Sequence, residues 1–385
     1  MKILISCGEP SGDLYAGALV REIRALDSEV HVYGLGGAQL RESGAELVED
    51  YRGLTVTGLS EALSVLPRSF AIYQRLVRLA RADRPDVFVP VDFPDFNFRL
   101  AGALHRLGIP IVYYVCPQVW AWRRGRLRTL KKFARRALVI FPFEEALYQQ
   151  AGIPAEFVGH PLLDLCQLNR TSKDLIRLKG LIPGKPTVAL LPGSRPNEVS
   201  AILADLVRSA LLIRQSVPGV QFLVARAPDL DNELFSPLVQ LSSSGVPLAV
   251  VESQTDDVLD AADVVVTASG TATIQAAIHG KPMVIVYRLS PLTYRVVRAF
   301  AHVSSVGMVN VVAGESVVPE LIQAAFTPTA VSAEVVRFLC DAEHAKRTRI
   351  SLGRVRDQLG VSGASRRAAE AVLAEGRSGR LSTSL

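Results

Sequence analysis

The sequence predicts an α/β protein with two domains, each built around a parallel β-sheet. Short apolar runs, typical of strands buried on both faces, alternate with segments of helical periodicity along most of the chain. Several of these runs end in a Gly-containing turn that leads directly into a helix. The length of 385 residues suits two domains. We expect an N-terminal domain at 1–167, a linker at 168–186, a second domain at 187–330, and C-terminal helices with a frayed tail at 331–385.

Composition excludes several classes of protein. The apolar content is too high for a disordered chain, and no apolar run approaches the roughly 18–20 residues of a membrane span. The first residues enter a strand and reach Glu9 and Asp13 too early for a signal peptide. The four cysteines show no CxxC spacing, which favours a reducing compartment and neither a disulfide framework nor a zinc site. We therefore expect a protein that is kept in the cytosol.

The first predicted unit is a strand at 3–6, a Gly-rich turn and a helix from about 14 to 26. The turn, Gly-Glu-Pro-Ser-Gly-Asp, contains Glu9, Ser11 and Asp13. It lies at the carboxyl end of a strand, which is the edge where open α/β sheets bind ligands. Ser11 and Asp13 also suit helix capping. Both interpretations stand for these two residues.

The N-terminal half contains further strand patterns and a second acidic turn. The other strands expected there are 30–33, 86–91, 109–115, 137–141 and 156–158. The strand at 86–91 is followed by Asp-Phe-Pro-Asp-Phe-Asn, which puts Asp92 just past the strand end and Asn97 further along. The glycines at 34–37 do not complete a dinucleotide-binding fingerprint.

The segment at 54–79 has apolar residues at three- and four-residue steps with arginines between them. The apolar positions are Leu59, Leu63, Leu66, Phe70, Tyr73 and Val77. One interpretation is a pair of amphipathic core helices. The other is a helix whose apolar face lies in a membrane interface or meets an acyl chain, with arginines toward anionic headgroups.

A basic stretch follows Trp120 and runs from Arg123 to Arg136. Such stretches form either a solvated helix face or a surface for an anionic partner, such as lipid headgroups, a phosphorylated substrate or nucleic acid. No nucleic-acid-binding motif is present, and the strand–helix alternation argues against such a module. We expect no nucleic-acid partner.

The second half begins with a predicted strand at 187–191. Pro192 and Gly193 end it, Ser194 suits a helix cap, and Arg195 lies in the turn. The turn therefore offers the N–H groups of a helix start, the positive end of the helix dipole and a guanidinium fork to an anion. A diphosphate suits this arrangement, although an ordinary turn with a surface arginine has the same pattern.

A second turn of this kind follows the strand at 263–267. The remaining strands expected in this half are 220–225, 248–251 and 283–287, and the chain past Pro319 is expected to be helical. The turn and helix start consist of small residues, namely Ser269, Gly270, Thr271 and Ala272. Gln275 lies one turn further on. Two such turns in one domain favour anion binding more than either does alone.

Six motifs together resemble one enzyme family. They are Gly-Glu-Pro-Ser-Gly-Asp at 8–13, Asp-Phe-Pro-Asp-Phe-Asn at 92–97, Val-Trp-Ala-Trp-Arg at 119–123, Gly-His-Pro-Leu at 159–162, Leu-Pro-Gly-Ser-Arg at 191–195 and Ser-Gly-Thr-Ala at 269–272. In this order they closely resemble the lipid-A-disaccharide synthases, which are glycosyltransferases of family 19. The resemblance implies a GT-B fold, in which two Rossmann-like domains enclose a cleft.

The resemblance also implies a reaction and partners. The reaction transfers 2,3-diacylglucosamine from its UDP donor to 2,3-diacylglucosamine 1-phosphate, gives a β-1,6-linked disaccharide and releases UDP. It implies no cofactor, a peripheral place on the cytoplasmic face of the inner membrane, and a homodimer. The C-terminal helices are expected to cross back to the first domain or to be exchanged between chains. Gln275 departs from the family, which more often has Glu there.

An inverting transfer needs one base, and we expect Asp92 in that role with Glu9 as the alternative. The donor is expected to contact Arg195 and the two turns, with Gln275 at the ribose and Arg288 and Asn310 as further contacts. The other expected acceptor-side or loop residues are Ser11, Asp13, Asn97, Trp120, Arg123 and His160. His160 suits either ligand contact or loop support.

No metal is expected, because the Asp-x-Asp string at 229–231 lies in a polar, Pro-flanked loop that we expect to face solvent.

Three other classes of function remain. One is a GT-B transferase or epimerase acting on non-acylated UDP-N-acetylglucosamine. Another is an NAD(P)-dependent dehydrogenase, which the incomplete glycine fingerprint disfavours. The third is a non-catalytic protein that binds a membrane surface or RNA.

Overall fold

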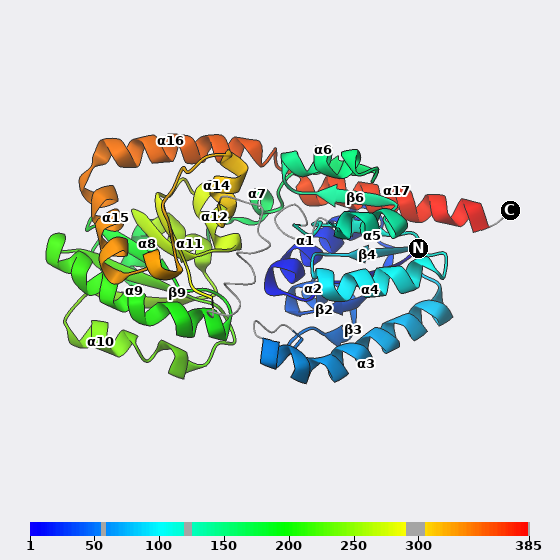
Figure 1. Ribbon diagram of the computed structural model, residues 1–385, viewed down its shortest axis with the longest axis horizontal. Helices are drawn as coiled ribbons and strands as arrows, with labels where there is room; N and C mark the ends of the chain where they lie inside the picture. The colour runs from blue at the N-terminus through cyan, green and yellow to red at the C-terminus, as the bar shows by residue number, and fades with distance from the viewer. Residues whose placement is uncertain (55–58, 119–124, 290–304, 384–385) are drawn as a thin grey trace. The chain divides into compact units, whose positions relative to one another are not determined.

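The chain forms two compact units that are not two consecutive halves. The computed structural model describes residues 1–54, 59–118, 125–289 and 305–383, and the side chains of 59–64 and 379–383 are not included in this description. Unit 1 combines Met1–Leu165 with Leu359–Leu385, and unit 2 lies between Cys166 and Gln358 (Figure 1).

Unit 1 contains parallel strands covered by helices. A four-stranded sheet has the order β3-β2-β1-β4, and a three-stranded sheet has the order β5-β6-β7. Two isolated parallel bridges, Phe88 to Ile111 and Val91 to Tyr114, connect them. The strands are β1 (Lys2–Ser6), β2 (His31–Gly36), β3 (Glu46–Asp50), β4 (Val87–Pro90), β5 (Val112–Tyr114), β6 (Arg136–Val139) and β7 (Ala155–Phe157). The helices are α1 (Pro10–Leu26), α2 (Ala38–Glu42), α3 (Leu59–Asp83), α4 (Pro94–His105), α5 (Arg126–Phe133), α6 (Pro142–Gln150), α7 (Leu162–Leu165) and α17 (Ala364–Thr383).

Unit 2 contains a six-stranded parallel sheet of order β10-β9-β8-β11-β12-β13. Its strands are β8 (Thr187–Leu191), β9 (Gln221–Arg226), β10 (Leu248–Glu252), β11 (Val264–Ala268), β12 (Met283–Tyr287) and β13 (Glu320–Ile322). The helical segments are α8 (Ser172–Leu178), α9 (Pro196–Ser216), η1 (Asn232–Phe235), α10 (Leu238–Ser243), α11 (Thr255–Ala261), α12 (Thr271–Ile278), α14 (Met308–Ala313), η2 (Gln323–Ala325), α15 (Pro328–Cys340) and α16 (Ala342–Gln358). The central strands β8 and β11 are buried along their whole length, as apolar runs in a parallel sheet require.

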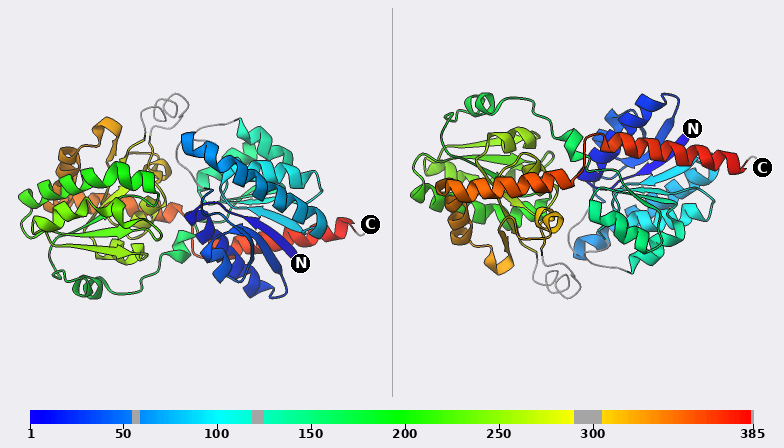
Figure 2. Two further views of the ribbon diagram at one scale, coloured as in Figure 1. Left: turned by 90° about the horizontal axis from the view of Figure 1, so that it is seen from below. Right: turned by 90° about the horizontal axis from the view of Figure 1, so that it is seen from above.

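The chain returns to unit 1 after α16, and its last helix packs against α1 (Figure 2). Asp164 fixes the start of α17, because its carboxylate accepts the N–H groups of Gly363 (2.8 Å) and Ala364 (3.0 Å). Further along the helix, Glu375 pairs with Arg135 at 2.6 Å. The N-terminal sequence and the C-terminal helix therefore form one core.

The structure differs from the sequence-based expectations in several elements. The edge strand β3 differs from expectation because three of its five residues are acidic, as is common in a loop, and β13 stands where only helix is expected. One interpretation of the segment at 54–79 is a pair of helices, but α3 is one helix with Pro67 inside it. The expected linker contains α8, in which Leu175 and Ile176 are buried. The end of the chain, expected to be a frayed tail, is helical as far as Thr383.

Candidate active site

Asp92 lies at the carboxyl end of β4 in an unusual backbone conformation. Asp92 has φ +46° and Phe93 has φ +50°, in the left-handed region that residues other than glycine seldom adopt. Each such residue costs on the order of 1 kcal/mol, so two in succession persist only where their surroundings hold them. Backbone strain of this kind is concentrated at functional sites. The half-buried Asp92 side chain thus lies on a strained turn, whose unfavourable backbone free energy is offset by the surrounding contacts.

Hydrogen bonds hold this turn from two sides. The carbonyl oxygen of Asp92 accepts the side-chain amide of Asn97 (2.8 Å) and the hydroxyl of Tyr113 (2.9 Å). The same Asn97 amide donates to the carbonyl of Ser6 (3.1 Å), and its oxygen accepts the Ser6 hydroxyl (2.7 Å). The fully buried Asn97 therefore ties the Asp92 turn to the end of β1. Asn97 was expected on the acceptor side. Its side chain instead holds the backbone of Asp92 through these bonds.

The first Gly-rich turn lies against the Asp92 turn. A Cβ placed on Gly8 would lie 2.3 Å from the ring of Phe93, so the two turns touch where only glycine fits. Glu9 is the half-buried N-cap residue of α1, and Ser11 is half-buried in the first turn of that helix. The structure therefore brings Glu9 and Asp92, the two expected acids, to neighbouring turns on one sheet edge.

Asp13 has a different place from the one expected near the acceptor. It is buried, and its carboxylate accepts the N–H groups of Gly37 (2.7 Å), Gln39 (2.9 Å) and Leu40 (3.2 Å). These are the N–H groups at the start of α2, so Asp13 caps a helix other than its own. The capping interpretation is the one that the structure supports for this residue.

His160 is enclosed in unit 1. It is 2% exposed, and its ring lies 6.0 Å from that of Tyr15 and 5.3 Å from that of Phe141. Its Nδ1 accepts the N–H of Leu162 (3.2 Å). Burial lowers the pKa of His160 from 6.5 to about 3, so the ring is neutral at physiological pH. These contacts favour loop support over charge-based ligand contact.

The turn between β8 and α9 holds a carboxylate in this structure. Gly193 has φ +121°, and Arg195 is the N-cap residue of α9. The N–H of Ser194 donates to Glu198 Oε2 (3.2 Å), and Arg195 Nη1 donates to Oε1 of the same residue (3.1 Å). The turn therefore has the groups and the geometry to bind an anion, and the chain's own Glu198 uses them here. Glu198 is a site residue that the motifs do not indicate, although an acid at the third helical position is a known capping signal.

The turn between β11 and α12 lies beside it. β8 and β11 are adjacent and parallel, with Leu191 opposite Thr267, so both turns leave the same edge of the sheet. Gly270 is the N-cap residue, and its carbonyl accepts the hydroxyl of Thr273 (2.8 Å). Ser269 donates its hydroxyl to the carbonyl of Val306 (3.2 Å). Thr271 and Ala272 form the first turn of α12, whose N–H groups point toward this edge.

Gln275 is half-buried in the middle of α12. Its Nε2 donates to Asp256 Oδ1 at 3.3 Å. Because the amide nitrogen is turned to a carboxylate, the amide oxygen is the acceptor that remains for a ligand. In this orientation the glutamine presents one oxygen acceptor.

Arg288 and Asn310, two expected donor contacts, are engaged inside unit 2. Arg288 forms an ion pair with Asp205, donates to the carbonyl of Phe326 (2.8 Å) and lies over the ring of that residue. Asn310 is buried, donates to Glu320 (2.8 Å) and Val318, and accepts two backbone N–H groups. A ligand would have to break these bonds before either side chain could contact it.

Trp120 and Arg123 lie outside the described residues. Within the described part of the basic stretch, Arg126 forms an ion pair with Asp95, and Arg136 with Glu156 (3.4 Å). Arg128 is exposed.

The acids of the Asp-x-Asp string at 229–231 are both exposed, as expected.

Comparison with known proteins gives the family. The family model described as "Lipid-A-disaccharide synthetase" matches residues 3–374. The chain belongs to the lipid-A-disaccharide synthase family. The lipid-A-disaccharide synthase of Geobacter metallireducens is 40% identical over 372 residues, which are 97% of this chain and 96% of that protein. The activity is accordingly that of a lipid-A-disaccharide synthase, and its substrates are acylated glucosamine sugars.

Solved structures give the fold of this synthase. The UDP-GlcNAc 2-epimerase of Neisseria meningitidis, bound to UDP-GlcNAc, has a TM-score of 0.67 at 13% identity and covers 97% of this chain and 100% of its own. A calicheamicin glycosyltransferase has a TM-score of 0.61 at 17% identity, with 97% and 98% covered. These similarities confirm the expected GT-B fold.

Membership of the synthase family does not favour the alternative functions considered from the sequence, including an enzyme for non-acylated UDP-N-acetylglucosamine. Among the described residues, no helix is long and apolar enough to cross a membrane.

Proposed function

We propose that this synthase transfers 2,3-diacylglucosamine from UDP-2,3-diacylglucosamine to 2,3-diacylglucosamine 1-phosphate, with inversion at the sugar carbon and without a metal. The main support for donor binding in unit 2 is the pair of turns at the starts of α9 and α12. These turns follow adjacent strands, and Arg195 lies at one of them. Two neighbouring sets of backbone N–H groups and a guanidinium suit a diphosphate.

The proposed base is Asp92. The donor is α-linked and the product is β-linked, so one displacement inverts the carbon. The acceptor's 6-hydroxyl oxygen bonds to that carbon, its proton passes to the Asp92 carboxylate, and the bond to UDP breaks. The strained and well-held turn supports this role, because a base must keep a fixed position. Glu9, on the neighbouring turn, is the alternative.

The leaving UDP gains charge as its bond to the sugar breaks. We assign the stabilisation of that charge to Arg195, to the N–H groups near Gly193 and Ser194, and to the turn at 269–273. Fixed donors of this kind stabilise a developing anion without a metal. Gln275 is assigned to the ribose through its amide oxygen. Glu198 must then release Arg195 and the Ser194 N–H when the diphosphate arrives.

The test is a radiolabelled transfer assay on wild-type protein and base variants. We expect Asp92→Ala and Asp92→Asn to lose on the order of 10²–10⁴ in turnover, as removal of a general base does. Asp229→Asn is the matched control, because it removes an exposed acid of unit 2. If Asp92→Asn keeps near-normal turnover while Glu9→Gln loses it, the base is Glu9. Loss of activity in a chelator that magnesium restores would contradict the metal-free mechanism.

The proposed location is the cytoplasmic face of the inner membrane, where the protein associates peripherally. Leu66 is 48% exposed and Phe70 is 59% exposed, four residues apart on α3, and the exposed Arg68 lies between them. An exposed apolar pair with a neighbouring cation suits a lipid interface or an acyl chain.

A homodimer is proposed on the family resemblance alone, and light scattering of the purified protein tests it.

A further inference from the structure

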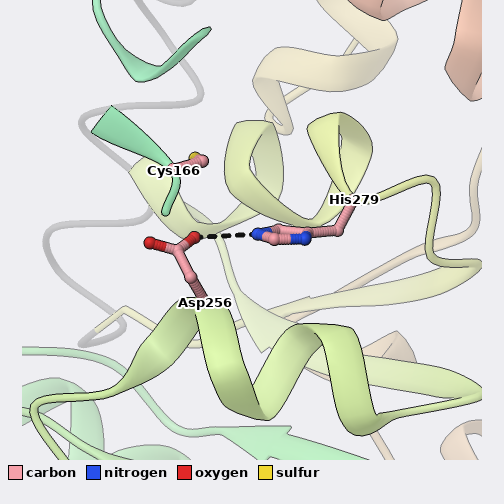
Figure 3. Close-up of side chains that lie close together, drawn as sticks. All are labelled: Cys166, Asp256 and His279. Atoms are coloured by element: carbon pink, nitrogen blue, oxygen red, sulfur yellow. Dashed lines mark hydrogen bonds and ion pairs between the residues drawn. The ribbon is translucent and has the colours of Figure 1, made fainter. Parts of the chain in front are cut away.

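Three side chains with metal-binding atoms lie close together in unit 2, outside the two turns assigned to the diphosphate. Cys166 stands at the start of the unit, Asp256 is in the first turn of α11, and His279 directly follows α12. The cysteine sulfur, a carboxylate oxygen and a ring nitrogen all lie within 4.8 Å of one another. Figure 3 shows Asp256 and His279 directed toward each other, with Cys166 beside them.

The cluster is partly withdrawn from water. The side chains of Asp256 and His279 are 17% and 11% exposed, and Cys166 is half-buried. Three separate segments supply the three groups, so the fold rather than local sequence brings them together. Partial exposure leaves access for an ion and for a water ligand.

The chemistry of the ligands selects the cation. Calcium and magnesium take oxygen ligands, whereas zinc takes cysteine sulfur, histidine nitrogen and carboxylate oxygen, commonly in a tetrahedron. We propose that Cys166, Asp256 and His279 bind a zinc-type divalent cation, with water in the fourth position. On binding, the thiol proton leaves to solvent and three protein–metal bonds form. This site goes beyond the proposed transfer reaction, although Gln275, which we assign to the ribose, contacts Asp256 at its edge.

The contact between His279 and Asp256 needs only a small change to admit the ion. His279 Nε2 lies 2.9 Å from Asp256 Oδ1. Zinc bonds of about 2.0–2.2 Å set two oxygen or nitrogen ligands of a tetrahedron roughly 3.4 Å apart. The ion therefore replaces one hydrogen bond and moves these atoms by about half an ångström. The Gln275 amide, 3.3 Å from the same oxygen, is placed to support the carboxylate as an outer-shell donor.

The electrostatics of the bound state also depend on the ion. A thiolate of Cys166 beside the Asp256 carboxylate would place two negative charges close together. A bound dication supplies the positive charge that stabilises both.

The test uses full-length protein stripped of metal and then titrated with zinc alone by calorimetry, and with cobalt as a spectroscopic probe. We expect one zinc per chain in the wild type, with a cobalt–thiolate charge-transfer band. Cys166→Ser and His279→Ala should weaken zinc binding at least about tenfold and remove the band or shift it. Cys340→Ser is the matched control, because Cys340 is an exposed thiol of the same unit.

Circular dichroism of each variant establishes whether it is folded. If His279→Ala does not fold, the conservative Cys166→Ser variant alone decides the test. Wild-type protein that takes up no stoichiometric zinc would overturn the proposal. So would folded Cys166→Ser protein that binds zinc as the wild type does. No nucleotide is present in these titrations, so an error in the donor-site assignment leaves their outcome unchanged.

Discussion

At the scale of single residues, side chains of the same chemical type have taken opposite roles. Asp13 and Asp92 both follow strands of unit 1, yet Asp13 is buried and accepts three backbone N–H groups, while the half-buried Asp92 lies on a strained turn. Likewise, Arg195 stands at a helix start whereas Arg288 is held by Asp205 and Phe326. The hydrogen-bond partners, rather than the residue types, separate supporting residues from candidates for chemistry.

Arg195→Ala should weaken UDP binding about 10- to 100-fold and abolish turnover. A charge-assisted hydrogen bond contributes about 1.5–3 kcal/mol, and the guanidinium is the one full positive charge that we assign to the diphosphate. Calorimetric titration with UDP measures the change. Arg208→Ala is the control, since Arg208 lies on the same helix and pairs with Asp205. Equal UDP affinity in Arg195→Ala and wild type would remove the residue from the donor site.

His160 should make the protein sensitive to acid. Its folded pKa of about 3 lies below the ordinary value of 6.5, so the unfolded state takes up a proton first as pH falls. The stabilising contribution is fully present above about pH 6.5 and is lost progressively toward pH 3. From about pH 8 to about pH 5 the loss is on the order of 2 kcal/mol. Urea unfolding measures the free energy of unfolding at both pH values. We expect its decrease between them to be smaller by this amount in His160→Gln than in the wild type. Equal decreases in the two proteins would contradict the lowered pKa of His160.

At the scale of elements, helix starts on adjacent strands do most of the positioning. α9 and α12 begin beside each other because β8 and β11 pair in parallel, and α1 begins beside the Asp92 turn because β1 pairs with β4. Parallel pairing puts every following turn at one edge of the sheet. Gly8 and Gly193 then allow close approach, the first against Phe93 and the second against Glu198.

Changing the exposed apolar pair of α3 should weaken binding to lipid. The double variant Leu66→Ser and Phe70→Ser removes two large side chains, each able to contribute about 1.5–3 kcal/mol on full burial. We expect at least a roughly tenfold lower affinity for vesicles of anionic lipid, measured by sedimentation. Val361→Ser is the control, since Val361 is 72% exposed elsewhere in unit 1. A double variant that sediments with vesicles as the wild type does would leave α3 without this role.

At the scale of the whole molecule, the chain order of the units matters. Unit 1 is completed only after unit 2 has been made, because α17 supplies buried residues to it. Those buried in α17 include Ala368, Ala369, Val372 and Leu373.

A chain that ends at Gln358 should therefore fail to fold unit 1. Losing these side chains and the Asp164 cap removes on the order of 5–10 kcal/mol, which is comparable with the stability of a domain. Limited proteolysis should then degrade the N-terminal 165 residues and spare unit 2. A chain that ends at Ser378 is the control and should resist. Equal protease resistance of the two truncated chains would contradict the structural role of α17.

The sequence by itself determined the α/β class, the buried strands at 187–191 and 264–267, the turns that follow them and the family. These are local properties, since apolar runs, glycines and motif order can be read along the chain. Only the tertiary structure decided that Asp13 caps α2, that Asn97 fixes Asp92, that Glu198 occupies the anion turn, and that Cys166, Asp256 and His279 come together. These contacts join residues brought together by sheet pairing and turn geometry, and their energies depend on positions in space that no local pattern specifies.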